Sequence, residues 1–218
     1  MRPDLFLSEM RMRLESNGVT IVEQCSIDNF IHQQGIAHAV GCNGDSIDAD
    51  HVVVATGAMT PFLNKHLGMK VPIEPGKGYS ITMPTPEQMP RVPLIFEDSH
   101  VAITPMKSKY RIGSTTEFVG WDRTIHQRRL NLLTEAAQKY LHDPMCKPIE
   151  ETWYGWRPMT WDGKPIIDRS PAMSNVWIAA GHSMLGLSMA PATGRLLCEL
   201  MTGQPAHLDA SHFRASRF

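Results

Sequence analysis

Apolar residues recur at spacings of three and four in three stretches of the chain, which is the pattern of a helix with one buried face. The stretches cover 3–17, 125–141 and 189–201. Thr124 and Gln127, three positions apart at the start of the second stretch, resemble a capping box. The pattern therefore predicts three amphipathic helices.

Short apolar runs bounded by turn residues predict β-strands. Four runs in the proline-punctuated middle of the chain are typical of an antiparallel sheet: Gly78–Met83, Leu94–Phe96, Val101–Thr104 and Tyr110–Ser114. Nearer the N-terminus, Val19–Val22 predicts a further strand. Ile36–Val40 and Ser46–Ile47 flank an Asn-Gly turn, which predicts a hairpin.

Two more apolar runs predict a parallel pair of strands. Val52–Ala55 carries three consecutive valines, and Val176–Ala180 is apolar throughout. Such runs are typical of strands buried on both faces of a parallel sheet. The first run ends in Ala-Thr-Gly, whose small residues would let a ligand or another backbone approach closely. An ordinary buried strand and turn would show the same pattern.

Composition limits the class of protein. The chain has 218 residues, 42% of them hydrophobic and 20% charged, as in a globular protein with a substantial core. Its net charge of -1 does not favour nucleic acid or an anionic membrane as a partner. No apolar run approaches the roughly 20 residues of a membrane span. The first residues carry charges throughout and are not expected to form a signal peptide.

The cysteines and histidines form no recognisable site. The four cysteines are Cys25, Cys42, Cys146 and Cys198. Without a Cys-x-x-Cys pair, this scatter favours reduced thiols in a cytoplasmic protein over a disulfide framework. The ten histidines show no spacing typical of metal ligands. The sequence therefore predicts no disulfide and no metal site.

The stretch Asn175–Gln204 combines a strand, a glycine turn and the start of a helix. Gly181 and Gly186 frame the turn. Such a unit directs free backbone N–H groups and the positive end of a helix dipole at whatever lies above the strand. An anion, or a ring that gains negative charge on reduction, suits that position. The alternative is a turn that faces only water.

Arg157 lies in the most aromatic segment of the chain. Three tryptophans, Trp153, Trp156 and Trp161, surround it together with Tyr154. A guanidinium among aromatic neighbours is not typical of a surface charge, and its planar fork matches a carboxylate. The alternative is an internal salt bridge or a stacking partner of the rings.

Several nucleotide-binding and hydrolytic motifs are absent from the sequence. It contains no strand, G-x-G-x-x-G and helix in succession, because Gly76 and Gly78 lead into a strand. It also contains no Walker loop, no G-x-S-x-G elbow and no H-E-x-x-H motif. No side chain is singled out as a catalytic acid or base.

Five segments in order resemble the FAD-dependent D-amino-acid oxidase/dehydrogenase superfamily, and most nearly its bacterial D-amino-acid dehydrogenase type. They are HVVVATGAMTPFL, PIEPGKGYSIT, YRIGSTTEFVG, WYGWRPMTWDGKPIID and NVWIAAGHSMLGLSMAPATGRLLCELMTG. The resemblance extends from Pro3 onward but covers only the second half of a family member. The glycine-rich phosphate loop and the ribose-binding acid would lie before Met1.

The resemblance implies a mixed α+β and α/β fold in two domains. Residues 1–60 and 158–218 would form a partial FAD-binding, Rossmann-like domain that lacks its glycine-rich first βαβ unit. Residues 61–157 would form a substrate-binding domain built on an antiparallel sheet.

The resemblance also implies roles for named residues. The cofactor-binding residues would be Ile27, Ala55, Thr56, Gly57, Gly181, His182, Met184, Leu185 and Gly186. Arg157 would bind the substrate carboxylate, and Tyr79 and Tyr154 would line the pocket. The N–H groups at the helix start would stabilise negative charge on the reduced flavin, in agreement with the interpretation of this turn from the residues alone.

The implied reaction is oxidation of a D-amino acid by hydride transfer to FAD, which gives an imine that hydrolyses to a 2-oxo acid and ammonia. This chemistry depends on placement and an electron sink more than on an acid–base pair. The alternatives are oxidation of glycine or sarcosine and a non-catalytic half without FAD.

Partners and location follow from the missing half. Half of a Rossmann-like sheet exposes an unpaired edge and an apolar face, so the chain is expected to self-associate or to need a partner that supplies the N-terminal half. A cytoplasmic protein is expected. The inner face of the membrane and a quinone acceptor remain further options.

Overall fold

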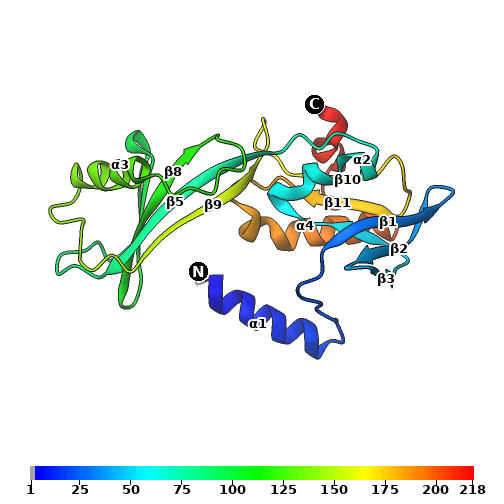
Figure 1. The fold of residues 1–218 in the computed structure, drawn as a ribbon, viewed down its shortest axis with the longest axis horizontal. Helices are drawn as coiled ribbons and strands as arrows, with labels where there is room; N and C mark the ends of the chain where they lie inside the picture. The colour runs from blue at the N-terminus through cyan, green and yellow to red at the C-terminus, as the bar shows by residue number, and fades with distance from the viewer. Residues whose placement is uncertain (1–2) are drawn as a thin grey trace. The chain divides into compact units, whose positions relative to one another are not determined.

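The computed structural model describes residues 3–218, and the chain divides between His51 and Val52 into two compact units (Figure 1). The first unit contains α1 (Pro3–Ser16), β1 (Ile27–Gln33), β2 (Ile36–Cys42) and β3 (Asp45–Asp48). Its strands form an antiparallel sheet in the order β1-β2-β3. The predicted N-terminal helix and the β2–β3 hairpin are confirmed, but no residue of α1 is buried, so the expectation of a buried apolar face is wrong for this helix.

The first unit contains one correctly predicted hairpin, one wrongly predicted strand and one strand that was not predicted. Asn43 and Gly44 have φ values of 52° and 90°, which the Asn-Gly pair adopts readily in a tight hairpin turn. The strand expected at Val19–Val22 is wrong, because this segment lies in a loop with both valines exposed. The sequence missed β1, in which only Phe30 is buried, so no apolar alternation marks it.

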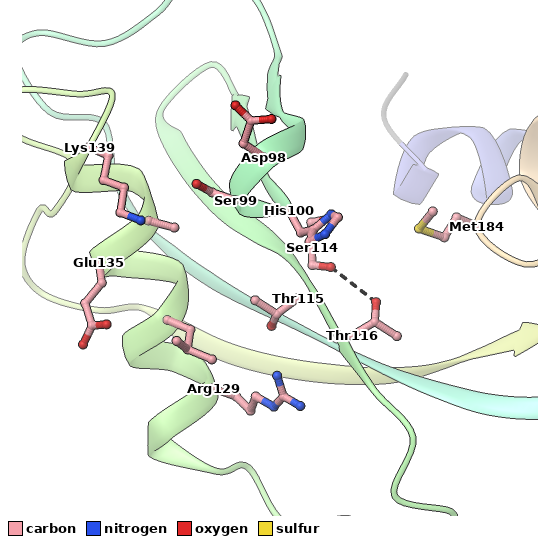
Figure 2. Close-up of a pocket in the computed structure, with 12 residues that line it drawn as sticks. Asp98, Ser99, His100, Ser114, Thr115, Thr116, Arg129, Glu135, Lys139 and Met184 are labelled. Atoms are coloured by element: carbon pink, nitrogen blue, oxygen red, sulfur yellow. Dashed lines mark hydrogen bonds between the residues drawn. The ribbon is translucent and has the colours of Figure 1, made fainter.

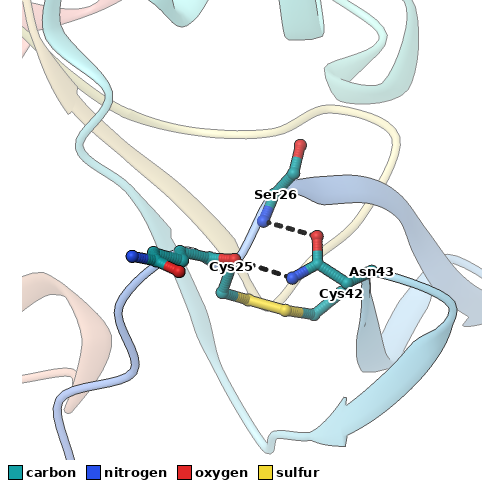
Figure 3. The surroundings of a disulfide bond; sticks show 5 residues. Cys25, Ser26, Cys42 and Asn43 are labelled. Carbon is teal, nitrogen blue, oxygen red and sulfur yellow. Dashed lines mark hydrogen bonds between the residues drawn. A yellow bond between two sulfur atoms is a disulfide. The ribbon is translucent and has the colours of Figure 1, made fainter.

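A disulfide joins Cys25 to Cys42 in the first unit, with their Cα atoms 5.6 Å apart (Figure 3). The Asn43 side chain accepts a hydrogen bond from the Ser26 N–H (3.2 Å) and donates one to the Gln24 carbonyl (2.7 Å). These bonds hold the segment that carries Cys25 against the end of β2. The expectation of reduced cysteines is therefore wrong for this pair, whereas Cys146 and Cys198 are free thiols.

The second unit contains a five-stranded antiparallel sheet. In spatial order its strands are β6 (Leu94–Phe96), β7 (Val101–Pro105), β8 (Lys109–Glu117), β5 (Glu74–Pro84) and β9 (Glu151–Met159). Short 3₁₀ turn η2 (Glu97–Ser99) joins β6 to β7. The four strands predicted in this region are confirmed.

Helix α3 (Gln127–Gln138) covers one face of this sheet. Its Leu130 and Leu133 join Tyr79, Ile81 and Met83 of β5 in a buried core. The predicted capping box is wrong, because the residue before the helix is His126 and no side chain caps the helix. Since side chains alternate along a strand, the glycines of β5 face the side of the sheet opposite α3.

The second unit also contains a smaller sheet in the order β10-β11-β4. It consists of β10 (Ile166–Arg169), β11 (Val176–Ala180) and β4 (Val52–Val54). β4 and β11 run parallel, as predicted, and β10 is antiparallel to β11. Helix α4 (Gly186–Met201) packs on this sheet through Leu196 and Leu197. The mixed fold expected from the sequence is confirmed.

One prediction for the smaller sheet is wrong in part. Val53 is 40% exposed, so β4 is not buried on both faces. Within residues 3–218, β4 pairs only with β11 and leaves its other edge without a strand. The remaining elements of the unit are η1 (Gly57–Leu63), α2 (Asn64–Leu67), η3 (Ala210–Phe213) and η4 (Ala215–Arg217).

Candidate functional site

The carboxyl ends of β4 and β11 meet at one edge of the smaller sheet. Val52 lies opposite Val176 and Val54 lies opposite Ile178. The segments that follow these parallel strands therefore start beside one another, although they are far apart in the sequence. The carboxyl edge of parallel strands is the usual place for a ligand in such sheets. The fold thus brings Ala55–Gly57 next to the glycine turn at Gly181.

Backbone conformation shapes the turn between β11 and α4. Gly181 and Ser183 have φ values of 78° and 50°, in the left-handed region. A Cβ atom on Gly181 would lie 2.8 Å from the Thr160 side chain, so the dihedral and the space both require glycine. The Ser183 N–H donates to the Pro158 carbonyl (3.0 Å), which fastens the turn to the end of β9.

The start of α4 supplies hydrogen-bond donors to this turn. The first bond in the helix is donated by the Met189 N–H to the Leu185 carbonyl (2.9 Å). The N–H groups of Gly186–Ser188 precede it and have no acceptor within the helix. They carry the positive end of the dipole of a 16-residue helix, which favours a ligand with negative charge at its edge.

His182 anchors the turn to the helix without adding charge. Its Nε2 atom lies 2.9 Å from the Thr193 hydroxyl. Burial of the imidazole lowers the pKa of His182 below its ordinary value of 6.5. The ring is therefore neutral at pH 7, and its contribution is to position the turn.

The turn presents apolar surface and one unused hydroxyl. Met184 and Leu185 are 65% and 58% exposed. Gly57, with φ 55°, has open space where a side chain would stand. The Ser183 hydroxyl is buried, and no partner for it lies within the described residues. Exposed apolar side chains beside free N–H groups and an unpaired hydroxyl fit a planar ring with an anionic edge, as the isoalloxazine of reduced FAD has.

Arg157 lies on β9, and its side chain extends over a glycine of the neighbouring strand β5. Its guanidinium donates to the Thr116 hydroxyl on β8, and it crosses Gly78 of β5 to reach it. A Cβ atom on Gly78 would lie 2.5 Å from the guanidinium carbon. The strand register places Gly78 opposite both Thr116 and Gly155, so small residues on this face leave room for the guanidinium.

No carboxylate pairs with Arg157 within residues 3–218, which removes the internal salt bridge as an explanation there. Burial lowers the pKa of Arg157, and no acidic neighbour opposes this effect. A guanidinium nevertheless stays protonated in proteins. Arg157 is therefore a half-buried cation without a counterion, which favours binding of an anion. The bond from Ser183 to Pro158, the next residue after Arg157, places this cation near the glycine turn.

Tyr79 and Tyr154 are not brought together with Arg157. They lie opposite each other in β5 and β9, one position away from the Gly78–Gly155 pair, and so face α3. Tyr79 is buried in the core and donates a hydrogen bond from its hydroxyl to Glu117 (2.5 Å). Both tyrosines therefore support the sheet from the face opposite the guanidinium.

The sequence analysis did not identify Lys77, a buried charge next to that core. Lys77 is fully buried, and its Nζ atom lies 3.2 Å from Asp122 and 5.0 Å from the centre of the Tyr154 ring. The Nζ group also donates to the Thr124 carbonyl (2.5 Å). Only the alternation of Lys77 with Tyr79 along β5 could have indicated that this lysine points inward. Its contacts fix the strand that carries Gly78.

Ile27, the remaining residue expected at the cofactor, stands at the start of β1 in the first unit. Its role stays a prediction. In the part of the chain that the structure describes, none of the helices is long and apolar enough to cross a membrane.

Solved structures with this fold include amino-acid dehydrogenases and oxidases. L-proline dehydrogenase from P. horikoshii superposes with a TM-score of 0.84 and is 26% identical, over 95% of this chain and 57% of that one. Glycine oxidase from Geobacillus kaustophilus gives a TM-score of 0.85 at 24% identity, over 94% of this chain and 55% of that one. The second likeness shows the fold alone.

The chain belongs to the FAD dependent oxidoreductase (DAO) family, whose sequence model matches residues 1–200. It is 32% identical to the D-amino acid dehydrogenase of Granulibacter bethesdensis over 216 residues, which cover 98% of this chain and 51% of the relative. It is 34% identical to that of Xanthobacter autotrophicus, over 92% of this chain and 48% of the relative. The chain therefore spans about half the length of these relatives. The predicted family is confirmed, and it is a family of FAD-dependent oxidoreductases.

Proposed function

We propose that this chain supplies the flavin-facing turn and the substrate-binding sheet of an FAD-dependent D-amino acid dehydrogenase. One observation carries the proposal. The fold brings Ala55–Gly57 and the turn at Gly181 to one sheet edge and ties that turn, through Ser183 and Pro158, to the strand of an unpaired Arg157. The names of the relatives support the substrate class.

In this proposal the cofactor is held from two sides of the sheet edge. Ala55, Thr56 and Gly57 form one wall, and the turn from Gly181 through Gly186 forms the other. The N–H groups of Gly186–Ser188 supply positive potential for the anionic edge of the ring. FAD, when bound, supplies the acceptor for the hydride that leaves the substrate Cα.

The chain's own contribution to the reaction is placement. Arg157 binds the α-carboxylate through its forked N–H groups, and Thr116 fixes the orientation of that fork. With the carboxylate held, the Cα–H is directed toward the glycine turn, while the amine must be neutral to form the imine. Hydrolysis of the imine in water then yields a 2-oxo acid and ammonia. No side-chain acid or base is required for this sequence.

The smaller sheet needs a neighbour for this function. The free edge of β4 presents unpaired backbone groups, and Val53 exposes apolar surface beside it. We propose that a polypeptide equivalent to the other half of the relatives pairs with this edge. We also propose that residues 1–60 and 158–218 serve the cofactor and 61–157 the substrate. A non-catalytic chain without FAD is the alternative.

The carboxylate-binding role of Arg157 can be tested without a loaded flavin. Binding of D-alanine to the chain is followed by amide chemical shifts, with ethylamine as the ligand that lacks the carboxylate. Arg157→Lys keeps the charge but loses the fork, so D-alanine affinity should fall by about ten-fold or more. Arg128→Gln removes an exposed arginine of α3 and serves as the control.

Two outcomes would contradict the proposal. Equal shifts with D-alanine and ethylamine would show that the carboxylate is not recognised. Unchanged affinity in Arg157→Lys would assign Arg157 a structural role. In parallel, a visible absorbance spectrum of the chain with added FAD distinguishes a flavin-binding chain from the non-catalytic alternative.

A further inference from the structure

A cleft of about 590 Å³ opens beside β8, the strand whose Thr116 accepts the hydrogen bond of Arg157 (Figure 2). It lies between η2, the end of β8 and one side of α3, with Met184 of the glycine turn at its other side. Thr116 belongs to both places, since it lines the cleft and accepts the hydrogen bond of Arg157. Thr116 therefore lies at the border between the cleft and the proposed substrate site.

The cleft exists because β8 extends beyond the end of its neighbour β7. The last residue pair between β7 and β8 is Ala102 with Gly113. From Ser114 to Glu117, one backbone edge of β8 has no strand beside it within the described residues. Strand alternation directs Thr116 toward Arg157 and Thr115 toward α3, so the cleft passes around this edge.

The floor of the cleft holds a buried hydroxyl without a partner and a guanidinium that is only partly used. Thr115 is 8% exposed, and its hydroxyl has no hydrogen-bond partner within residues 3–218. Burial of an unpaired hydroxyl is costly, so such a group marks a position where a ligand or water is expected. Arg129 approaches from α3, and its bond to Glu117 (2.6 Å) uses only the Nε atom. Figure 2 shows its guanidinium extending from α3 toward the side of Thr116.

The rim of the cleft carries charges of both signs, from two acidic side chains and one basic side chain. Asp98 and Glu135 are acidic, Lys139 is basic, and His100 lies beside Ser114. An apolar ligand side chain would leave the polar groups at the floor of the cleft without partners. A charged ligand side chain would be attracted by some of the rim charges and repelled by others. The Thr115 hydroxyl can donate or accept a hydrogen bond, and the outer guanidinium nitrogens of Arg129, which the bond to Glu117 does not use, can only donate. They match an oxygen acceptor.

We infer that this cleft binds the side chain of the substrate and selects amino acids whose side chain ends in an oxygen acceptor, a carboxamide or a carboxylate. This inference rests on the proposed function for the identity of the substrate. Thr115 and the outer nitrogens of Arg129 hold the distal oxygen, while Arg157 holds the α-carboxylate at the other end of the same molecule.

The test uses probes that carry only the distal group. Butanamide and butanoate are titrated into the labelled chain, and the amide shifts of Ser114–Thr116 and the Arg129 Nε–H signal are followed. We expect saturable shifts at these positions. Thr115→Val should weaken probe binding roughly five-fold, the value of one hydrogen bond. Thr152→Val makes the same substitution on an exposed site of β9 and should leave binding unchanged.

The outcomes separate this inference from the proposed function. Stronger binding of butanamide assigns a carboxamide side chain to the substrate, and stronger binding of butanoate assigns a dicarboxylic one. Absence of shifts at Ser114–Thr116 with both probes overturns the inference, as does identical probe affinity in Thr115→Val. Because Arg157 contacts Thr116 and can itself bind butanoate, both probes are also titrated into Arg157→Lys, where the shifts of Thr115 and of the Arg129 Nε–H signal should persist. Conversely, failure of Arg157→Lys to weaken D-alanine binding leaves the probe result standing and rejects only the carboxylate-binding site.

Discussion

Gly78 decides where the Arg157 guanidinium can lie. The space above Gly78 is the path by which the guanidinium crosses β5 to reach Thr116. A methyl group there would meet the end of a flexible side chain rather than backbone, so Arg157 would move while the sheet persisted. Gly78→Ala should therefore weaken D-alanine binding about as much as Arg157→Lys does, with little change in thermal stability.

Gly194 provides the matched control for Gly78→Ala. It lies within α4, and nothing stands within 4 Å of the position that a Cβ atom would take. Gly194→Ala should raise stability by about 0.5–1 kcal/mol, because alanine has the higher helix propensity, and should leave D-alanine binding unchanged. Thermal melts and the D-alanine titration check both variants. A Gly78→Ala chain that binds normally would show that the guanidinium need not cross β5.

The sequence revealed Arg157 but neither Gly78 nor Thr116. An arginine among tryptophans is conspicuous, since aromatic neighbours mark a partly buried segment. Gly78 is one glycine among sixteen, and its importance comes from a strand pairing that no local pattern records. The family resemblance implied that Tyr79 and Tyr154 line the pocket. The period of two along the strand instead places them on the face toward α3.

At the scale of elements, a carboxylate on α4 holds the chain that follows the helix. Glu199 accepts hydrogen bonds from the ring (2.7 Å) and the backbone N–H (2.8 Å) of His207, and from Arg195 (2.8 Å). The bond from the His207 ring is the main cause that lowers the pKa of Glu199 from 4.5 to about 2. The unfolded chain therefore binds a proton at a pH where the folded chain does not.

The sign of the resulting pH dependence follows from that difference. The stabilising contribution of Glu199 is fully present above pH 4.5 and is lost as the pH falls toward about 2. Glu199→Gln should lower the melting temperature at pH 7 and should flatten its decline across this acidic range. Melts at a series of pH values measure this, with Glu87→Gln in an exposed loop as the control. A decline of equal slope in wild type and Glu199→Gln would refute the assignment.

Elements with strong local signals were predicted, and elements made by tertiary contacts were not. Four of the five strands of the large sheet are short apolar runs that end at turns, and this local pattern was enough to predict them. β1 carries a single buried residue, Phe30, and exists because β2 and the Asn43 turn lie beside it. Thr124 was expected to cap α3, but its N–H is held by Asp122 (2.9 Å) and the helix begins later.

At the scale of the whole molecule, the free edge of β4 predicts association. A strand edge with unpaired backbone groups and an exposed valine is a template for another strand. In the absence of its proposed partner, the 24.4 kDa chain should elute from size-exclusion chromatography as a larger species whose mass, by light scattering, rises with concentration.

Val53→Lys should shift this equilibrium toward the monomer, because a charge at an edge strand opposes edge-to-edge pairing. Val22→Lys places the same charge on an exposed loop valine outside any sheet and should leave the distribution as in wild type. If both variants dissociate the assembly equally, general solubility rather than the β4 edge is responsible. If wild type is already monomeric at all concentrations, the edge is not an association site. The specific response of Val53→Lys would instead identify β4 as the place where a partner must pair to complete the flavin site that its carboxyl end begins.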